Sequence, residues 1–144
     1  MRAGCRALSV GILVAVRCDV AQAELAPRVP PAERAAARSL ENPFAATPEN
    51  AERGRVLYAG KGFCSACHGR EGRGLGADVD VSRLRGALPR DLTEPAWQRA
   101  RSDGELFWVL RNGIDGTAMA PFVPSVLSEA EAWQVILYLR SLAR

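Results

Sequence analysis

A chain of 144 residues, 48% of them hydrophobic, is long enough to form one compact domain with its own core. Residues 1–23 hold three of the 19 basic residues and one of the 16 acidic ones, so 16 basic and 15 acidic residues remain in the rest of the chain. This nearly neutral balance argues against a nucleic-acid-binding protein. No repeat or low-complexity tract indicates a solenoid.

The first 23 residues have the order of a secretory signal peptide. Arg2 and Arg6 precede an apolar run at 7–16, and small residues at 21–23 form a cleavage site. The ten-residue apolar run is too short to cross a bilayer of about 30 Å as a helix. We therefore expect a signal peptide over 1–23, a periplasmic protein, and no transmembrane helix after processing.

Two alternatives to cleavage after Ala23 remain open, an uncleaved anchor and a lipid on Cys18, the second disfavoured by Arg17 beside it. Cleavage would also remove Cys5 and Cys18. The remaining thiols would then be those at positions 64 and 67, which leaves no separate pair for a structural disulfide.

Residues 24–46 form a proline-rich segment, with Pro27, Pro30, Pro31 and Pro43. Prolines this close together favour an extended arm, with one short helical turn around 33–38. The arm could lie along the domain or along a partner. A solvated tail is an equally good interpretation.

A domain over 47–144 begins with a clear helix start. Thr47 supplies an N-cap hydroxyl, Pro48 suits the first helical position, and Glu49 lies near the positive end of the helix dipole. We expect a helix over 48–59. Gly54 in its middle costs about 1 kcal/mol relative to alanine, which predicts that the C-terminal helix crosses closely there.

Cys64-Ser65-Ala66-Cys67-His68 is a CxxCH motif of the kind that attaches c-type haem. The two thiols can form thioether bonds with one haem, and the imidazole can bind its iron. A thioredoxin-like redox CxxC is expected beside a βαβ pattern, which is absent here. A structural zinc site needs four ligands, and His68 is the only histidine. Chance spacing is the remaining alternative.

The segment after His68 is rich in glycine, at 69, 72, 74 and 76. A phosphate-binding loop is rejected, because no strand precedes it and no lysine followed by Ser or Thr is present. Glycines here would let the backbone wrap the edge of a flat ligand. Residues 78–90 lack a clear period and are predicted to be a loop.

Two further helices and a loop are expected before the C-terminal helix. Pro95 opens a short helix that carries Trp97, and Ser102 to Glu105 form a capping box for a helix that ends at Asn112 and Gly113. Its residues on one face are expected to form one wall of a pocket: Leu106, Phe107 and Leu110.

Met119 stands in an irregular segment at 114–124 and is the only methionine besides Met1. A methionine in an apolar helix is usually a core filler, but packing alone does not explain one in a loop beside Pro121. We therefore expect Met119 to bind the iron through its thioether sulfur if a haem is present.

The last helix is predicted over 129–142, opened by a capping box from Ser128 to Glu131. Arg140 and Arg144 would lie favourably near its negative end. Its expected buried stripe has four members, with Tyr138 beside them: Trp133, Ile136, Leu137 and Leu142.

Together these features resemble a class I monohaem cytochrome c over about 42–144. The resemblance rests on the CxxCH motif and on a set of other residues in the same order: Gly54, Tyr58, Asn112, Gly113, Met119, Trp133 and Tyr138. It implies an all-α fold of about four to five short helices around one covalent haem c, with Cys64, Cys67, His68 and Met119 binding the cofactor and His68 and Met119 ligating the metal.

One departure from the family concerns the residue behind His68. Such proteins resemble one another in having a proline about a dozen residues later, whose carbonyl orients the imidazole, whereas this chain has Val79 to Ser82 there. Pro89 is the nearest candidate. As contacts for the haem propionates, the candidates are Arg83, Arg90 and Trp97.

The resemblance implies an electron carrier rather than an enzyme. His/Met ligation raises the reduction potential, which suits transfer from a dehydrogenase or membrane complex to an acceptor such as a terminal oxidase. Docking would be transient, through an apolar patch of Ala118, Ala120, Pro121, Phe122 and Val123. The alternative, a haem enzyme or gas-binding protein, needs an open or displaceable sixth ligand.

Overall fold

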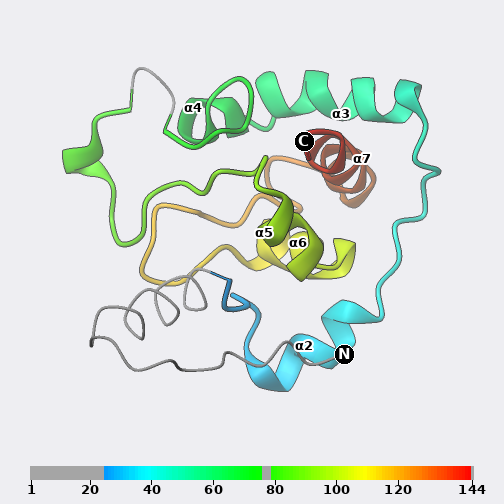
Figure 1. Ribbon diagram of the computed structural model, residues 1–144, viewed down its shortest axis with the longest axis horizontal. Coiled ribbons are helices and arrows are strands. Elements are labelled where there is room, and N and C mark those ends of the chain that lie inside the picture. Colours follow the sequence, from blue (N-terminus) through cyan, green and yellow to red (C-terminus); the bar gives the residue numbers. More distant parts are fainter. Residues whose placement is uncertain (1–24, 76–78, 144) are drawn as a thin grey trace, which may run out of the picture.

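The computed structural model describes residues 25–75 and 79–143 (Figure 1). The predicted signal peptide, Cys18 and Arg144 lie outside these ranges. Within them the secondary structure is helical, with no strand, which confirms the all-α fold class. No helix in the described ranges has both the length and the apolar character needed to cross a membrane.

The described part of the chain contains six α-helices and one 3-10 turn, compared with the four to five helices expected. Their bounds are α2 Pro31–Arg38, α3 Pro48–Ala59, α4 Cys64–His68, the 3-10 turn Val81–Arg83, α5 Pro95–Ala100, α6 Asp103–Asn112 and α7 Glu129–Ser141.

The predicted caps form as the sequence suggests. The Thr47 hydroxyl accepts from the backbone N–H of Asn50, and Ser102 and Ser128 each form a reciprocal capping box with the glutamate three residues later. Each cap satisfies backbone N–H groups that a helix leaves without a partner. This local chemistry explains why the starts of α3, α6 and α7 agree with the prediction.

Helices α3 and α7 cross, as predicted, at Gly54. A Cβ atom on Gly54 would collide with the carbonyl oxygen of Gln134 and come within 3.0 Å of the Tyr138 side chain. One turn further along α3, the rings of Tyr58 and Tyr138 meet edge to face with centroids 5.1 Å apart. Figure 1 shows α3 running across α7, which is seen nearly end-on.

The core lies between α6 and α7. The four residues of the predicted stripe are buried, three of them on α7 and Leu142 directly after its end. The rings of Phe107 and Trp133 stack with centroids 4.2 Å apart. Phe107 therefore packs into the core and does not line the cavity described below. The expectation that it forms a pocket wall is wrong, although Leu106 and Leu110 do line the cavity.

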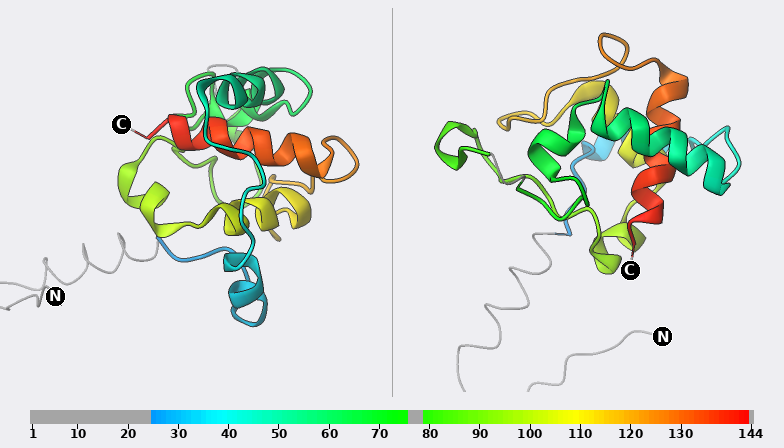
Figure 2. Two further views of the ribbon diagram at one scale, coloured as in Figure 1. Left: turned by 90° about the vertical axis from the view of Figure 1, so that its right-hand side faces the viewer. Right: turned by 90° about the horizontal axis from the view of Figure 1, so that it is seen from above.

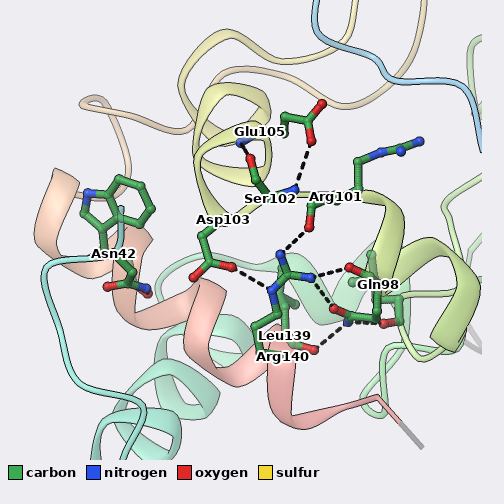
Figure 3. A network of polar contacts seen from close by, with 10 residues as sticks. Asn42, Gln98, Arg101, Ser102, Asp103, Glu105, Leu139 and Arg140 are labelled. Atoms are coloured by element: carbon green, nitrogen blue, oxygen red, sulfur yellow. Dashed lines mark hydrogen bonds and ion pairs between the residues drawn. The ribbon is translucent and has the colours of Figure 1, made fainter. Parts of the chain in front are cut away.

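Arg140 joins three helices through one polar network (Figure 3). Its guanidinium donates to the carbonyl and side-chain oxygens of Gln98, to the carbonyl of Arg101 and to the carboxylate of Asp103, all at 2.6–2.7 Å. Gln98 in turn donates to the carbonyl of Leu139. Arg140 thus lies in the last turn of α7, as expected, and also fixes α5 and α6 against that helix.

The proline-rich arm lies along the domain. Helix α2 packs against α6, on the opposite side of the molecule from α3 (Figure 1). The segment between α2 and α3 then passes across α6 and α7 (Figure 2, left), and the side-chain amide of Asn42 donates to the carbonyl of Trp133. In the described part of the arm, the contact with the domain is therefore extensive.

Candidate functional site

The CxxCH motif forms its own short helix, α4. Phe63 before it has a left-handed backbone (φ 55°), which turns the chain sharply into the helix. Residues three apart lie on one face of a helix, so Cys64 and Cys67 are brought together. Both are free thiols of intermediate burial. The Tyr58 hydroxyl donates to the carbonyl of Gly69 at 2.7 Å and ties the end of α4 to α3.

A cavity of about 480 Å³ opens beside α4. Cys64, Cys67, His68 and Met119 all line it, although His68 and Met119 are 51 positions apart. The remaining lining is mainly apolar, with Leu92 and side chains of α5, α6 and α7. This volume is in the range of about 300–1,000 Å³ that is usual for cofactor pockets.

His68 is oriented by a main-chain carbonyl. Its Nδ1 atom lies 3.0 Å from the carbonyl oxygen of Arg90. A carbonyl can only accept, so Nδ1 carries the proton and Nε2 keeps its lone pair for a metal. Burial lowers the pKa of His68, against the opposing effect of the bond to Arg90. The imidazole is therefore held in the neutral form that binds iron.

The partner of His68 comes from a later loop than family resemblance implies. It is the residue after Pro89 and lies 22 positions beyond the histidine. Two backbone bonds hold the base of this loop: Gly74 donates to the carbonyl of His68 at 3.0 Å, and Leu92 donates to that of Gly72 at 2.6 Å. A Cβ on Gly74 would lie 2.8 Å from the Pro89 carbonyl oxygen, so this close approach requires glycine.

Met119 is held by its own loop. Its N–H donates to the Thr117 hydroxyl at 3.1 Å, and its carbonyl accepts from Ile114 at 2.8 Å. Phe122 then donates to the carbonyl of Leu110 and fastens the loop to α6. The side chain is partly buried and lines the cavity.

The thiol of Cys64 is protonated at neutral pH, because burial raises its pKa to about 11.

Within the described residues no group of three or more His, Cys, Asp or Glu side chains could hold a metal ion. The alternative of a zinc site therefore gains no support from the described part of the chain.

The donor set fits a haem. Two adjacent thiols, a neutral imidazole and a thioether meet at one apolar cavity, which is the set of side chains that c-type haem uses. Three arginines, Arg28, Arg90 and Arg101, line the cavity together with the acidic residues Asp91 and Glu105. The arginines suit the carboxylates of a haem.

Of the three residues expected to contact the haem propionates, two lie at the cavity and one does not. Arg90 and Trp97 line the cavity, whereas Arg83 does not. Its Nε pairs with Asp80 at 3.2 Å, and its side chain is 86% exposed. The expectation for Arg83 is therefore not supported.

The lining residues that sequence reasoning missed include Arg28, Val29 and Arg101. The first two belong to the arm, where neither a period nor a motif marks a buried side. Arg101 lies between α5 and α6, and the sequence there does not distinguish an arginine with a structural role from one that is exposed to solvent.

The model of one protein family, described as cytochrome C oxidase, cbb3-type, subunit III, matches residues 49–139. Among solved structures, a chain of the reducing HAO-like protein complex of Kuenenia stuttgartiensis is similar, with a TM-score of 0.61 and 29% sequence identity. The match covers 71% of this chain and 47% of that one, so this chain spans about half the length of its structural neighbour. No curated protein matches the sequence.

Proposed function

The chain belongs to the family described as cytochrome c oxidase, cbb3-type, subunit III, and from this premise we propose that it is a periplasmic electron carrier with a single covalent haem c. The observation that carries the proposal is that Cys64, Cys67, His68 and Met119 line one cavity. Membership of the family implies haem-based electron transfer. The count of one haem rests on the single CxxCH motif.

Each of the four side chains has a distinct role in the proposal. Cys64 and Cys67 would hold the haem through thioether bonds, and His68 and Met119 would bind the metal through Nε2 and the thioether sulfur. When bound, the haem supplies an iron that takes up and releases one electron.

The rest of the site keeps these groups in place. The carbonyl of Arg90 fixes the orientation of the imidazole and makes it a better ligand. The apolar side chains of Leu92, Leu106 and Leu110 line the cavity and would keep water away from a bound haem. A thioether ligand in a dry pocket raises the reduction potential.

A redox complex is the proposed partner. The structural neighbour belongs to a complex described as HAO-like, which supports a dehydrogenase-like donor. A membrane complex is the other donor considered, and a terminal oxidase is the proposed acceptor. The N-terminal sequence of residues 1–23 supports export to the periplasm.

The proposed docking surface is the apolar rim of the cavity. Of the patch expected from the sequence, Ala118, Ala120 and Pro121 are exposed. Val123 is only 5% exposed and packs in the core, so its expected place in the patch is wrong. Two exposed side chains that line the cavity extend the rim: Phe63 at 72% and Leu88 at 54%.

The absorption spectrum of the purified protein tests the proposal. We expect a low-spin spectrum with one covalent haem per chain and, in the oxidised protein, the weak far-red band that marks a thioether sulfur on ferric iron. A high-spin spectrum would contradict the closed site and favour a haem enzyme or gas-binding protein. Mass spectrometry of the intact chain counts the haems.

A further inference from the structure

The arm of the chain contributes to the cavity, although it precedes the residues that the family model matches. Arg28 and Val29 line the cavity, and Val29 is only 2% exposed. Leu25 packs against the hydrophobic core. The segment 25–29 therefore lies between the cavity and the outside of the molecule. Without this segment the cavity would have an incomplete wall.

Arg101 holds this segment from the domain side. Its Nη2 donates to the carbonyl oxygens of Leu25 at 2.8 Å and Ala26 at 2.7 Å, and its Nη1 donates to that of Ala100 at 3.0 Å. The residue is 8% exposed and lines the cavity. A planar guanidinium can bridge two carbonyls in this way, whereas a lysine ammonium acts as a point charge.

Helix α2 anchors the arm at a second place. Arg38 pairs with Glu105 at 3.2 Å, and the indole N–H of Trp108 donates to the Glu33 carboxylate at 2.8 Å. A Cβ on Gly104 would collide with the carbonyl oxygen of Ala37, so α2 and α6 touch backbone to backbone. The segment 25–29 is thus held by Arg101 near one end and by α2 beyond the other.

We propose that residues 25–29 are a built-in wall of the haem pocket, latched by Arg101, and that this wall sets the reduction potential. The proposal rests on the proposed function. An oxidised haem iron carries one more positive charge than the reduced iron, so an apolar wall that keeps water away disfavours oxidation. The charge of Arg101 is offset by the Glu105 carboxylate, which also lines the cavity, so we expect the potential to follow the wall and not that charge. Opening the wall therefore lowers the potential.

Two substitutions of Arg101 distinguish the effect of its hydrogen bonds to the arm from the effect of its charge. Arg101→Lys keeps the charge and loses the bridge between two carbonyls, and Arg101→Met loses both. Val29→Ala leaves the latch intact and thins the wall. The matched controls are Arg83→Lys and Arg83→Met, because Arg83 is an exposed arginine outside the cavity lining.

Trypsin cleavage after Arg28 measures whether the arm is docked, because the next residue, Val29, is buried in the closed wall. Cleavage of a transiently opened segment follows the population of the open form. We expect Arg101→Lys to speed this cleavage about tenfold, which corresponds to about 1.4 kcal/mol of docking free energy. Spectroelectrochemistry of the same samples should show a lower potential with the far-red band retained.

The proposal is overturned if Arg101→Lys is cleaved after Arg28 at the native rate, or if it is cleaved faster while its potential equals that of Arg83→Lys. Val29→Ala, which thins the wall without changing any charge, should lower the potential, and an unchanged potential would show that the segment is not a wall. If Arg101→Met does not fold, these two variants carry the test. Failure of the proposed function is seen separately, as a native protein without the spectrum of a six-coordinate c-type haem.

Discussion

At the scale of single residues, the site depends on two side chains that could be identified from the sequence and on one carbonyl that could not. His68 and Met119 stand out because each lacks a competitor of its type in the part of the chain after residue 23. The carbonyl of Arg90 could not be identified in this way. Every residue has a carbonyl, and only the path of the loop decides which one reaches Nδ1 of His68.

Met119→Leu tests the ligand itself. Leucine fills a similar volume, and such swaps usually cost less than about 1.5 kcal/mol of folding free energy. We expect the oxidised protein to lose the far-red band and the reduction potential to fall, because the thioether that raises it is gone. Ile114→Leu, in the same loop and also lining the cavity, is the control that should retain the band. A band that survives in Met119→Leu would show that another group binds the iron.

At the scale of elements, the helix starts were predictable and two other features were not. Ser102, Ser128 and Thr47 act on their own turns, so their caps could be read without knowledge of the fold. Helix α4 has only five residues and is held by contacts outside itself, such as the hydrogen bond from the Tyr58 hydroxyl to the carbonyl of Gly69. The docking of α2 depends on partners about 70 residues away, which no local pattern encodes.

Gly54→Ala tests the crossing of α3 and α7. In an exposed helix this change would stabilise by about 1 kcal/mol. Here the new methyl meets the backbone oxygen of Gln134, which cannot move without separating the two helices. We expect a net loss of about 1–3 kcal/mol, measured by thermal unfolding of the haem-loaded protein. Glu52→Ala on the exposed side of α3 should change stability by less than about 1 kcal/mol. A gain in melting temperature for Gly54→Ala would contradict the close crossing.

Arg140→Met tests the network that joins α5, α6 and α7. The change removes four donated hydrogen bonds and leaves their acceptors without that partner. Because about a quarter of the Arg140 side chain is exposed, we expect the free energy of unfolding to fall by about 2–3 kcal/mol, which is less than the loss for a fully buried pair. Chemical denaturation measures this free energy.

The control for Arg140 is Arg111→Met, which removes an exposed pair with Glu129 at 3.6 Å. Exposed pairs contribute about 0–1 kcal/mol. Equal losses in the two variants would mean that the network adds nothing beyond a surface ion pair.

At the scale of the whole molecule, the fold class could be predicted, because one motif and the helix periods suffice for it. The cavity wall could not, since it combines the arm, α6 and two loops that are distant in sequence. The exposed patch was predicted in part. Alternation of small and apolar residues does not show that Val123 points inward while Ala120 points outward.

Phe63→Asn tests the docking rim. Asparagine tolerates the left-handed backbone of this position, so the fold should be kept while an exposed apolar ring next to Cys64 is removed. We expect the second-order rate of electron transfer with the donor to fall about tenfold at an unchanged potential, which equals about 1.4 kcal/mol of docking free energy. Stopped-flow spectroscopy measures the rate.

The control for Phe63 is Val56→Asn, an exposed apolar residue on α3 that does not line the cavity. Its rate should equal that of the native protein. A rate for Phe63→Asn that matches this control would place the docking surface elsewhere.

The loop that supplies the partner of His68 is closed at its base by the bonds from Gly74 to His68 and from Leu92 to Gly72. The later part of this loop is packed, because Gly86 lies against the backbone of Gly116 and the three residues after it line the cavity, so only the exposed turn that precedes Gly86 can change in length. Doubling the length of a flexible loop costs only about 0.6 kcal/mol. Residues near the exposed 3-10 turn Val81–Arg83 are thus a place where sequence can be inserted or removed without disturbing the iron ligand, and where a peptide tag or tether could be built into the protein.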